Sequence, residues 1–331
     1  MLRVIAAIAA LGLAGAGPAP QEPPPSLPPE LSAVLDDERA AQAFDYMALK
    51  AAGADLRALS GAVYRQAGPA PGEIRRCLTD GELALLDGLA GARAAPDQAT
   101  FDADREAAVT ALAQWDAFAA ALPTGLRPTE QPLLAIFELN ERAAQAGTDR
   151  ERQLHARRAR DQTIRIAWEA GNQVWGPLTP GARARVELGL SRRMCEVDGE
   201  NTAWLKADIA ANGWYRISAF GPEASRAAWL LVQHADRDPA FQTEVLAVLE
   251  PLASEGEIEP WHYAYLFDRV AVNTGRLQRY GSQGRCEARG VWGPQPLEDP
   301  ERVEALRAAF EMGPLSEYAA RMHRFCADHE G

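Results

Sequence analysis

A helical spacing of apolar residues, repeated along almost the whole length, is the feature that most constrains this chain. Apolar residues recur three and four positions apart, and alanine, the residue with the strongest intrinsic preference for helix, is abundant among them. We therefore predict an all-α, multi-helical fold. The expected helices cover residues 31–66, 80–91, 98–121, 129–146, 149–175, 180–194, 199–212, 222–236, 239–255, 260–274, 300–312 and 315–328.

Capping signals mark several ends of these helices. Thr79-Asp80-Gly81-Glu82 and Thr148-Asp149-Arg150-Glu151 both fit a capping box, in which a threonine and a glutamate satisfy free backbone amides reciprocally. One segment departs from the helical pattern, because 276–283 and 289–293 have the character of two short strands. We predict one small β-hairpin near residues 276–294.

Composition changes near residues 146–150. The chain before this point is rich in alanine, whereas the chain after it contains all five histidines and most of the tryptophans and tyrosines. We therefore expect an N-terminal helical region at 31–147. A C-terminal domain at 148–331 should then carry the hairpin and any functional site.

The N-terminus has the composition of an export signal. Arg3 precedes the uncharged apolar run 4–13, and Ala14-Gly15-Ala16 supplies the small residues that a signal peptidase requires. We predict a signal peptide at 1–16 and a proline-rich spacer at 17–30, which places the mature protein in the periplasm or outside the cell. An uncleaved anchor is the alternative, although the run is shorter than the ~20 apolar residues that span a bilayer.

The charge of the chain narrows the choice of partners. The formal net charge is −12, which disfavours nucleic acid and anionic membrane surfaces. We expect neither nucleic acid nor, after signal cleavage, a membrane as a partner. An unknown small molecule or a periplasmic protein is the expected class of partner.

Four cysteines in an exported chain suggest two disulfides. Cys286 and Cys326 flank the last helical segments, so we favour the pair Cys286–Cys326, which leaves Cys77–Cys195. Zinc binding is the alternative, but no Cys-x-x-Cys spacing is present. Paired cysteines would also exclude catalysis by a cysteine nucleophile.

The segment from Trp229 to Gln242 is the densest in functional residue types. Asp238, followed by proline, is expected to be a helix N-cap. His234 falls in the last turn of the preceding helix, where it is either a structural group favoured by the helix dipole or a general base oriented by Asp236 or another carboxylate. These side chains diverge at a helix end and Asp238 is needed for its cap, so we predict no metal site.

The next helix presents Tyr265, Asp268 and Arg269 on one face, because they are three and four residues apart. Arg269 could hold a substrate carboxylate or a developing oxyanion, and Asp268 could orient His234. The alternative is that Asp268 and Arg269 form ion pairs that only fasten helices together.

Three polar side chains follow in the first predicted strand. Gln278 and Tyr280 are two residues apart and would share one face of a strand, and Gln283 follows them. An amide-and-phenol face suits hydrogen bonding to a polar ligand. It suits equally the fixing of a hairpin against helices.

Residues 233–242 and 263–283 resemble the signature of an uncharacterised bacterial domain family. The shared pattern is Gln233-His-x-Asp-x-Asp-x-x-Phe-Gln242, then Tyr263-x-Tyr-Leu-x-Asp-Arg-Val-x-Val-Asn273-x-Gly-x-x-Gln-x-Tyr-Gly-x-Gln283. The similarity covers roughly residues 150–325, and Ser282 replaces the usual threonine. The resemblance implies a common fold and a common site without naming a reaction, and through it Gln233 joins the expected substrate-binding side chains.

Familiar catalytic motifs and cofactor fingerprints do not occur in the sequence. It contains no Gly-x-Ser-x-Gly elbow, His-Glu-x-x-His motif, phosphate loop or dinucleotide fingerprint, so we expect no cofactor. Two interpretations remain for the polar residues. One is an acid/base or hydrolytic site, with His234, Asp236, Asp268 and Arg269 as catalytic residues and Gln233, Tyr265, Gln278, Tyr280 and Gln283 as substrate-binding residues. The other is a non-catalytic binding or scaffold module in which the same cluster is structural.

Overall fold

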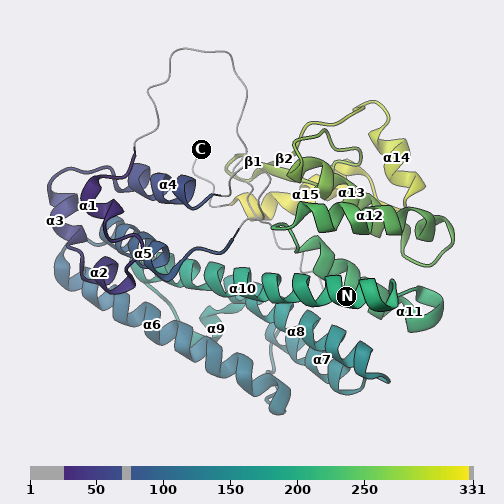
Figure 1. Ribbon diagram of the computed structural model, residues 1–331, viewed down its shortest axis with the longest axis horizontal. Helices are drawn as coiled ribbons and strands as arrows, with labels where there is room; N and C mark the ends of the chain where they lie inside the picture. The colour runs from purple at the N-terminus through teal and green to yellow at the C-terminus, as the bar shows by residue number, and fades with distance from the viewer. Residues whose placement is uncertain (1–25, 69–75, 328–331) are drawn as a thin grey trace. The chain divides into compact units, whose positions relative to one another are not determined.

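The computed structural model describes residues 26–68 and 76–327, and most of these residues are helical (Figure 1). The predicted all-α fold with one small β-hairpin is confirmed. The predicted signal peptide at 1–16 and the spacer residues 17–25 lie outside the described residues. Within the described ranges, no helix combines the length and the apolar character needed to cross a membrane.

The elements follow one another in a simple order. In the first part of the chain they are α1 (Pro29–Ser32), α2 (Glu38–Ala43), α3 (Tyr46–Ala51), α4 (Leu56–Gln66), α5 (Asp80–Ala94), α6 (Gln98–Ala121), η1 (Leu122–Thr124), α7 (Leu133–Ala144), α8 (Asp149–Ala170), α9 (Asn172–Trp175) and α10 (Pro180–Asn212). They continue with α11 (Ile217–Gln233), α12 (Pro239–Ser254), α13 (Pro260–Asn273), β1 (Gly284–Ala288), β2 (Val291–Pro294), α14 (Val303–Ala309), α15 (Leu315–Met322) and η2 (His323–Cys326).

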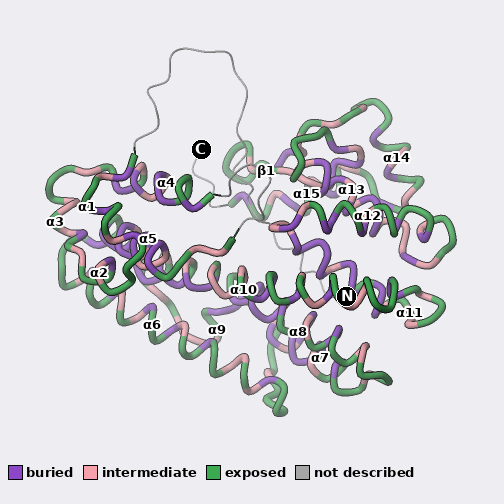
Figure 2. The backbone as a smooth tube through the Cα atoms, viewed as in Figure 1, coloured by how far each residue is buried: buried purple, intermediate pink, exposed green. Residues whose placement is uncertain are grey.

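The described residues form two compact units, each built from stretches that are separate in the sequence. Unit 1 contains residues 26–68, 76–144 and 159–197, and unit 2 contains residues 145–158 and 198–327. Each unit has its own buried apolar clusters, and Figure 2 shows how buried and exposed residues alternate along the helices. The predicted boundary between residues 147 and 148 stays a prediction.

The helix predicted at 31–66 is wrong as a single element, because aspartates divide it. Asp37, Asp45 and Asp55 each accept hydrogen bonds from backbone amides two or three residues ahead. An aspartate in this role starts a new helix, since its carboxylate satisfies the free amides of the first turn. The structure therefore has α1 to α4 in place of one long helix.

The opposite error concerns α10, which we expected as two helices at 180–194 and 199–212. The observed helix is continuous from Pro180 to Asn212. No proline occurs between the two parts, and Arg192 in the first part donates from Nε at 2.6 Å to Oε1 of Glu196, which lies in the expected gap. A pair four residues apart supports the helix where we expected it to break.

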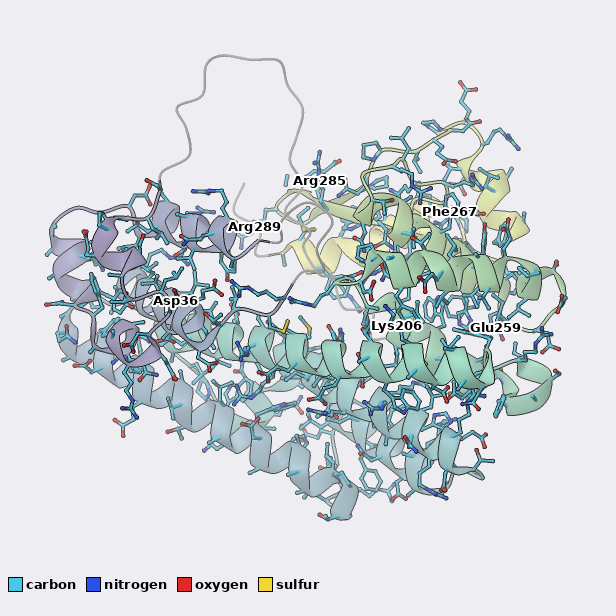
Figure 3. All side chains as sticks on the ribbon, in the orientation of Figure 1. Asp36, Lys206, Glu259, Phe267, Arg285 and Arg289 are labelled. Carbon is cyan, nitrogen blue, oxygen red and sulfur yellow. A yellow bond between two sulfur atoms is a disulfide. The ribbon has the colours of Figure 1, made fainter. Side chains whose placement is uncertain are left out.

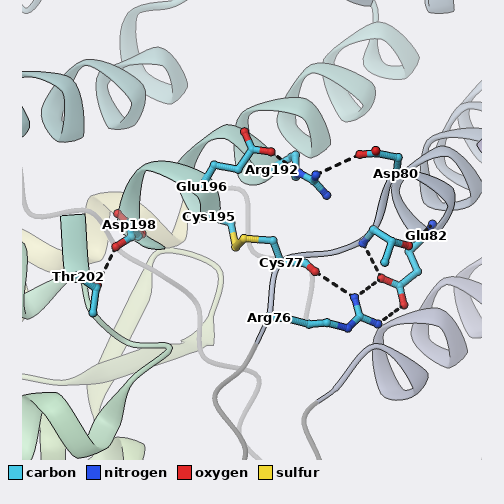
Figure 4. The surroundings of a disulfide bond; sticks show 10 residues. Arg76, Cys77, Asp80, Glu82, Arg192, Cys195, Glu196, Asp198 and Thr202 are labelled. Atoms are coloured by element: carbon cyan, nitrogen blue, oxygen red, sulfur yellow. Dashed lines mark hydrogen bonds and ion pairs between the residues drawn. A yellow bond between two sulfur atoms is a disulfide. The ribbon is translucent and has the colours of Figure 1, made fainter. Parts of the chain in front are cut away.

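Both disulfides have the favoured pairing. Cys77–Cys195 lies in unit 1, where Cys77 stands two residues before Thr79, the N-cap of α5 (Figure 4). Cys286–Cys326 lies in unit 2. Thr79 and Glu82 form the expected reciprocal cap, and Arg76 pairs with Glu82. All four cysteines are oxidised, which leaves no thiolate for zinc.

The hairpin is present, but its first strand begins later than predicted. β1 and β2 pair antiparallel, with Cys286 opposite Trp292. Residues 276–283 were expected as the first strand and instead form a loop, in which Gly281 adopts the left-handed backbone conformation (φ +67°). A strand pairs its amides with a neighbouring strand, whereas here several loop amides point to one buried carboxylate, described below.

In unit 2, His262 is a buried histidine in an aromatic setting. Its ring stacks on Trp229 with the ring centres 4.4 Å apart, and Trp261 meets it edge-on at 4.0 Å. Neither ring nitrogen is hydrogen-bonded to a described residue. Burial lowers the pKa of His262 well below its ordinary value, and the positive charge of Arg226 lowers it further.

This burial predicts that stability depends on pH. A histidine in the unfolded chain titrates near pH 6.5, so below that pH the unfolded chain binds a proton that the folded protein does not. Stability is then complete above pH 6.5 and falls as the pH decreases, by about 1.4 kcal/mol per pH unit. The variant His262→Phe should flatten the pH dependence in urea unfolding just below pH 6.5.

The control for this experiment is Tyr263→Phe, which alters the same helix without removing a group that titrates in this range. It should keep the pH dependence of the wild-type protein. An equally steep loss of stability in His262→Phe and in the wild-type protein would show that another group is responsible.

Candidate functional site

The junction between α11 and α12 places two candidate residues, His234 and Asp236, and the predicted N-cap Asp238. His234 is the C-cap residue of α11 and is buried. Asp238 is the expected N-cap of α12, because its Oδ1 accepts from the amide of Phe241 at 3.0 Å. Its Oδ2 accepts from Lys206 Nζ at 2.7 Å. Figure 3 labels Lys206 on α10. Asp236 lies between His234 and Asp238 and is partly exposed.

Asp236 forms an ion pair with Arg269 from α13. Arg269 Nε donates to Asp236 Oδ1 at 2.9 Å, and the side-chain amides of Asn273 and Gln242 donate to the same oxygen at 3.0 and 3.2 Å. Burial alone would raise the pKa of Asp236. The charge of Arg269, the two amides and the nearby His234 outweigh burial and lower that pKa, so the carboxylate is charged at neutral pH.

Gln283 extends this pair into a small network. Arg269 donates from Nη1 to Gln283 Oε1 at 2.9 Å, and Gln283 Nε2 donates to Ser282 Oγ at 3.1 Å. Gln242 is itself fixed, because its amide also donates to the carbonyl of Val232 at 3.0 Å. Side chains from the α11–α12 junction, α12, α13 and the 278–283 loop therefore meet at one place in unit 2.

The buried carboxylate of Asp268 shapes the 278–283 loop. Its Oδ1 accepts from the backbone amides of Arg279 and Tyr280 at 2.8 and 2.9 Å, and its Oδ2 accepts from the amide of Ser282 at 2.8 Å. Burial raises the pKa of Asp268, although the three amides lower it. Both oxygens are thus engaged by the backbone, and orientation of His234 by Asp268 stays a prediction.

The buried side chain of Gln278 also supports this loop through hydrogen bonds to its backbone. It is fully buried, donates from Nε2 to the carbonyls of Gln283 and Gln295 at 2.8 and 2.6 Å, and accepts from the amide of Gln283 at 2.9 Å. Its side chain therefore takes the place of a neighbouring strand. Gln278 sets the backbone position of Gln283.

The remaining supports of the loop come from later in the chain. Arg307 donates to the carbonyl of Tyr280 at 2.6 Å, and the hydroxyl of Tyr318 donates to the carbonyl of Ser282 at 2.9 Å. The ring of Tyr280 is buried against Phe267 and Phe310. Side chains from α14 and α15 therefore hold the loop in addition to Asp268 and Gln278.

Tyr265 and Gln233 lie in different surroundings from the ion pair. The ring of Tyr265 contacts Tyr318 and Trp261, and burial raises its pKa. Gln233 is buried, its carbonyl accepts from Gln242 at 3.4 Å, and its Nε2 donates to no described residue. Their predicted roles in substrate binding stay predictions.

Sequence reasoning missed Asp198 as a neighbour of His234. Both residues are buried, and a carboxylate oxygen of Asp198 lies within 4.8 Å of an imidazole nitrogen of His234. We expected a break in the helix at 195–198, so Asp198 was assigned to no helical face. An imidazole and a carboxylate at this spacing suit proton transfer, and they are also ligand types that a metal ion accepts.

Gln242 and Asn273 were also missed, although the sequence contained a signal for both. They are the last residue of the first part of the family signature and the asparagine of the second part. The structure brings together Asp236, Arg269 and Gln283 with these two amides. It uses Asp268, Gln278 and Tyr280 to build the loop that carries Gln283.

Comparison with protein-family models gives a match over the second half of the chain. A family model described as a family of unknown function matches residues 149–326. No curated protein and no solved structure matches the chain. The matched range includes all residues of the network around Asp236.

The geometry around Asp268 predicts a large effect for Asp268→Asn. Asparagine has one acceptor oxygen, so in either orientation its NH₂ group faces a backbone amide that also needs an acceptor. We expect the free energy of unfolding to fall by about 2–3 kcal/mol, the typical contribution of hydrogen bonds to a charged group. Urea unfolding measures the loss, and hydrogen exchange should accelerate at the amides of Tyr280 and Ser282.

Asp299→Asn provides the matched control. Among the described residues, Asp299 Oδ1 accepts only from the amide of Arg302 at 3.3 Å, near the protein surface. Its substitution should change stability by less than about 0.5 kcal/mol. Equal stability of the two variants would show that the Asp268 carboxylate does not hold the loop.

Proposed function

Because the chain belongs to the Family of unknown function (DUF6624), which carries no assigned activity, we propose a function from the site itself. Unit 2 binds a small polar molecule at Asp236 and Arg269, and His234 transfers a proton to or from it. Hydrolysis is the simplest reaction that such a group of residues supports.

The observation that carries this proposal is the fixed position of the Arg269 guanidinium group. Asp236 and Gln283 hold two of its nitrogen atoms, and Gln283 belongs to a loop supported by Asp268 and Gln278. A purely structural ion pair between helices has no need of a separately supported loop. A binding site does need one, because a fixed donor loses little conformational entropy when a ligand arrives.

His234 supplies the group for proton transfer. An unperturbed imidazole titrates near neutral pH, and a carboxylate neighbour favours its charged form and orients the ring. Asp198 is such a neighbour, with a carboxylate oxygen within 4.8 Å of an imidazole nitrogen of His234. The charge of His234 in turn contributes to lowering the pKa of Asp236. We propose His234 as the acid/base group. Asp198 and Asp236 are the two neighbouring carboxylates that we propose to act on its imidazole.

Export is part of the proposal. The sequence of residues 1–16 favours a cleaved signal peptide, and the two disulfides are typical of proteins that function outside the reducing cytosol. The proposed location is the periplasm or the exterior of the cell. The disulfides of both units would then form after translocation.

A non-catalytic binding or scaffold module is the second candidate. It is favoured by Asp268, Gln278 and Tyr280, three predicted site residues whose described contacts all support the loop or the core. In this case the network around Asp236 fixes the loop to α13 and His234 belongs to the core. The two candidates differ in what His234 contributes.

The test compares His234→Gln with the wild-type protein, both as residues 17–331. The substrates are chromogenic 4-nitrophenyl esters, 4-nitrophenyl phosphate and aminoacyl 4-nitroanilides. We expect hydrolysis of at least one class by the wild-type protein, and a kcat/KM that is about 100-fold lower in His234→Gln, as for loss of a general acid or base. The melting temperature should be retained.

His323→Gln is the control, because glutamine can still accept the hydrogen bond that His323 Nδ1 accepts from the amide of Trp292. This variant should keep wild-type rates. If His234→Gln instead unfolds unit 2 and the wild-type protein turns over no substrate, the scaffold interpretation is correct.

A further inference from the structure

Only one oxygen of Asp236 is occupied by donors from the described part of the chain. Arg269, Asn273 and Gln242 all donate to Oδ1, and no described residue donates to Oδ2. The side chain remains 25% exposed, so a ligand can approach it. A charged carboxylate oxygen accepts strong hydrogen bonds, which makes Oδ2 an acceptor held in a fixed position.

Arg269 also keeps an available group. Nε and Nη1 donate to Asp236 and Gln283, whereas Nη2 donates to no described residue, and the side chain is 14% exposed. Nη2 and Nε lie on the same edge of the planar guanidinium group and donate in parallel directions. One N–H bond of Nη2 therefore lies beside the hydrogen bond from Nε to Asp236.

The charges of the pair argue against a simple ion as the ligand. Asp236 is negative at neutral pH and lies 2.9 Å from the positive Arg269, so the two charges largely cancel for a ligand bound beside both. An anion drawn to Arg269 is repelled by Asp236, and a cation has the opposite conflict. A neutral group with a donor next to an acceptor has neither conflict.

We propose that this site recognises an uncharged primary carboxamide group, in which one N–H points to the same side as the carbonyl oxygen. The amide oxygen accepts from Arg269 Nη2, and the amide N–H donates to Asp236 Oδ2. In a primary carboxamide one N–H and the carbonyl oxygen lie on the same edge, as the donor and the acceptor are neighbours on the ion pair, whereas a trans peptide bond directs the two groups to opposite sides. The assignment rests on the proposed function and names the substrate class of that site.

The test uses three probes of nearly equal shape: acetamide, acetate and acetamidinium. Acetamide offers a donor and an acceptor, acetate offers acceptors only, and acetamidinium offers donors only. Binding is followed on ¹⁵N-labelled wild-type protein through the Nε–H signal of Arg269 and the side-chain amides of Asn273 and Gln283. We expect saturable shifts with acetamide, with a Kd at least about fivefold lower than for either ion, equivalent to about 1 kcal/mol.

Asp236→Asn should change the preference between the probes. The NH₂ group of the introduced side chain replaces the free oxygen with a donor, so this amide nitrogen and Arg269 Nη2 would both donate to the ligand without a negative charge nearby. Acetamide should bind more weakly than to the wild-type protein, and acetate should bind more tightly.

Glu298→Gln is the matched control. It removes a carboxylate from the exposed pair between Arg279 and Glu298, outside the site, and should leave all three affinities unchanged. The wild-type measurements do not depend on the folding of any variant.

Two results would overturn the assignment in different ways. A wild-type preference for acetate or acetamidinium shows that the site binds an ion, which refutes the amide class and leaves the proposed function standing. Absence of saturable shifts with all three probes refutes recognition at this pair. The hydrolysis experiment with His234→Gln then decides the proposed function independently.

Discussion

The candidate site depends on one buried interaction, the carboxylate of Asp268 with the backbone amides of Arg279, Tyr280 and Ser282. A carboxylate in the interior is costly unless donors surround it, and three amides supply that compensation. Because the carboxylate needs these donors, the chain after α13 folds into a loop and does not continue as a strand. Gln283 is the last residue of this loop, and its Oε1 accepts from Arg269. A structural carboxylate thus determines where a polar side chain of the site lies.

A second carboxylate, Asp236, has a different relation to its surroundings. It is partly exposed, and its three protein donors share one oxygen. The protein fixes the group and lowers its pKa while leaving the other oxygen to solvent or a ligand. The two aspartates therefore differ in role. Asp268 accepts hydrogen bonds from backbone amides through both oxygens, whereas Asp236 keeps one oxygen available to solvent or a ligand. Fixing a group in advance reduces the entropy lost on binding.

The sequence predicted individual local features better than their connections. Asp238 was recognised as an N-cap because the signal lies within four residues, and the capping box at Thr79 was recognised for the same reason. The aspartates that divide α1 to α4 use the same physics, but alanine-rich helical spacing on both sides concealed them. Asp198 could not be connected with His234, because α10 and α11 meet through packing that no local pattern encodes. For Gln242 and Asn273 the family signature was present, and only their partner, Asp236, had to come from the structure.

The sequence by itself determined the all-α class, the presence of a hairpin, the favoured disulfide pairs and the segment in which the polar site lies. These follow from periodicity, capping and composition, which act over a few residues or over the whole chain. Tertiary structure alone decided which polar groups meet, since residues 236, 269 and 283 belong to separate segments. It also decided that residues 276–283 form a loop, because amides of the predicted strand donate to the buried carboxylate of Asp268 on α13. Hydrogen-bond partners are chosen in three dimensions, and local sequence specifies only the groups that require one.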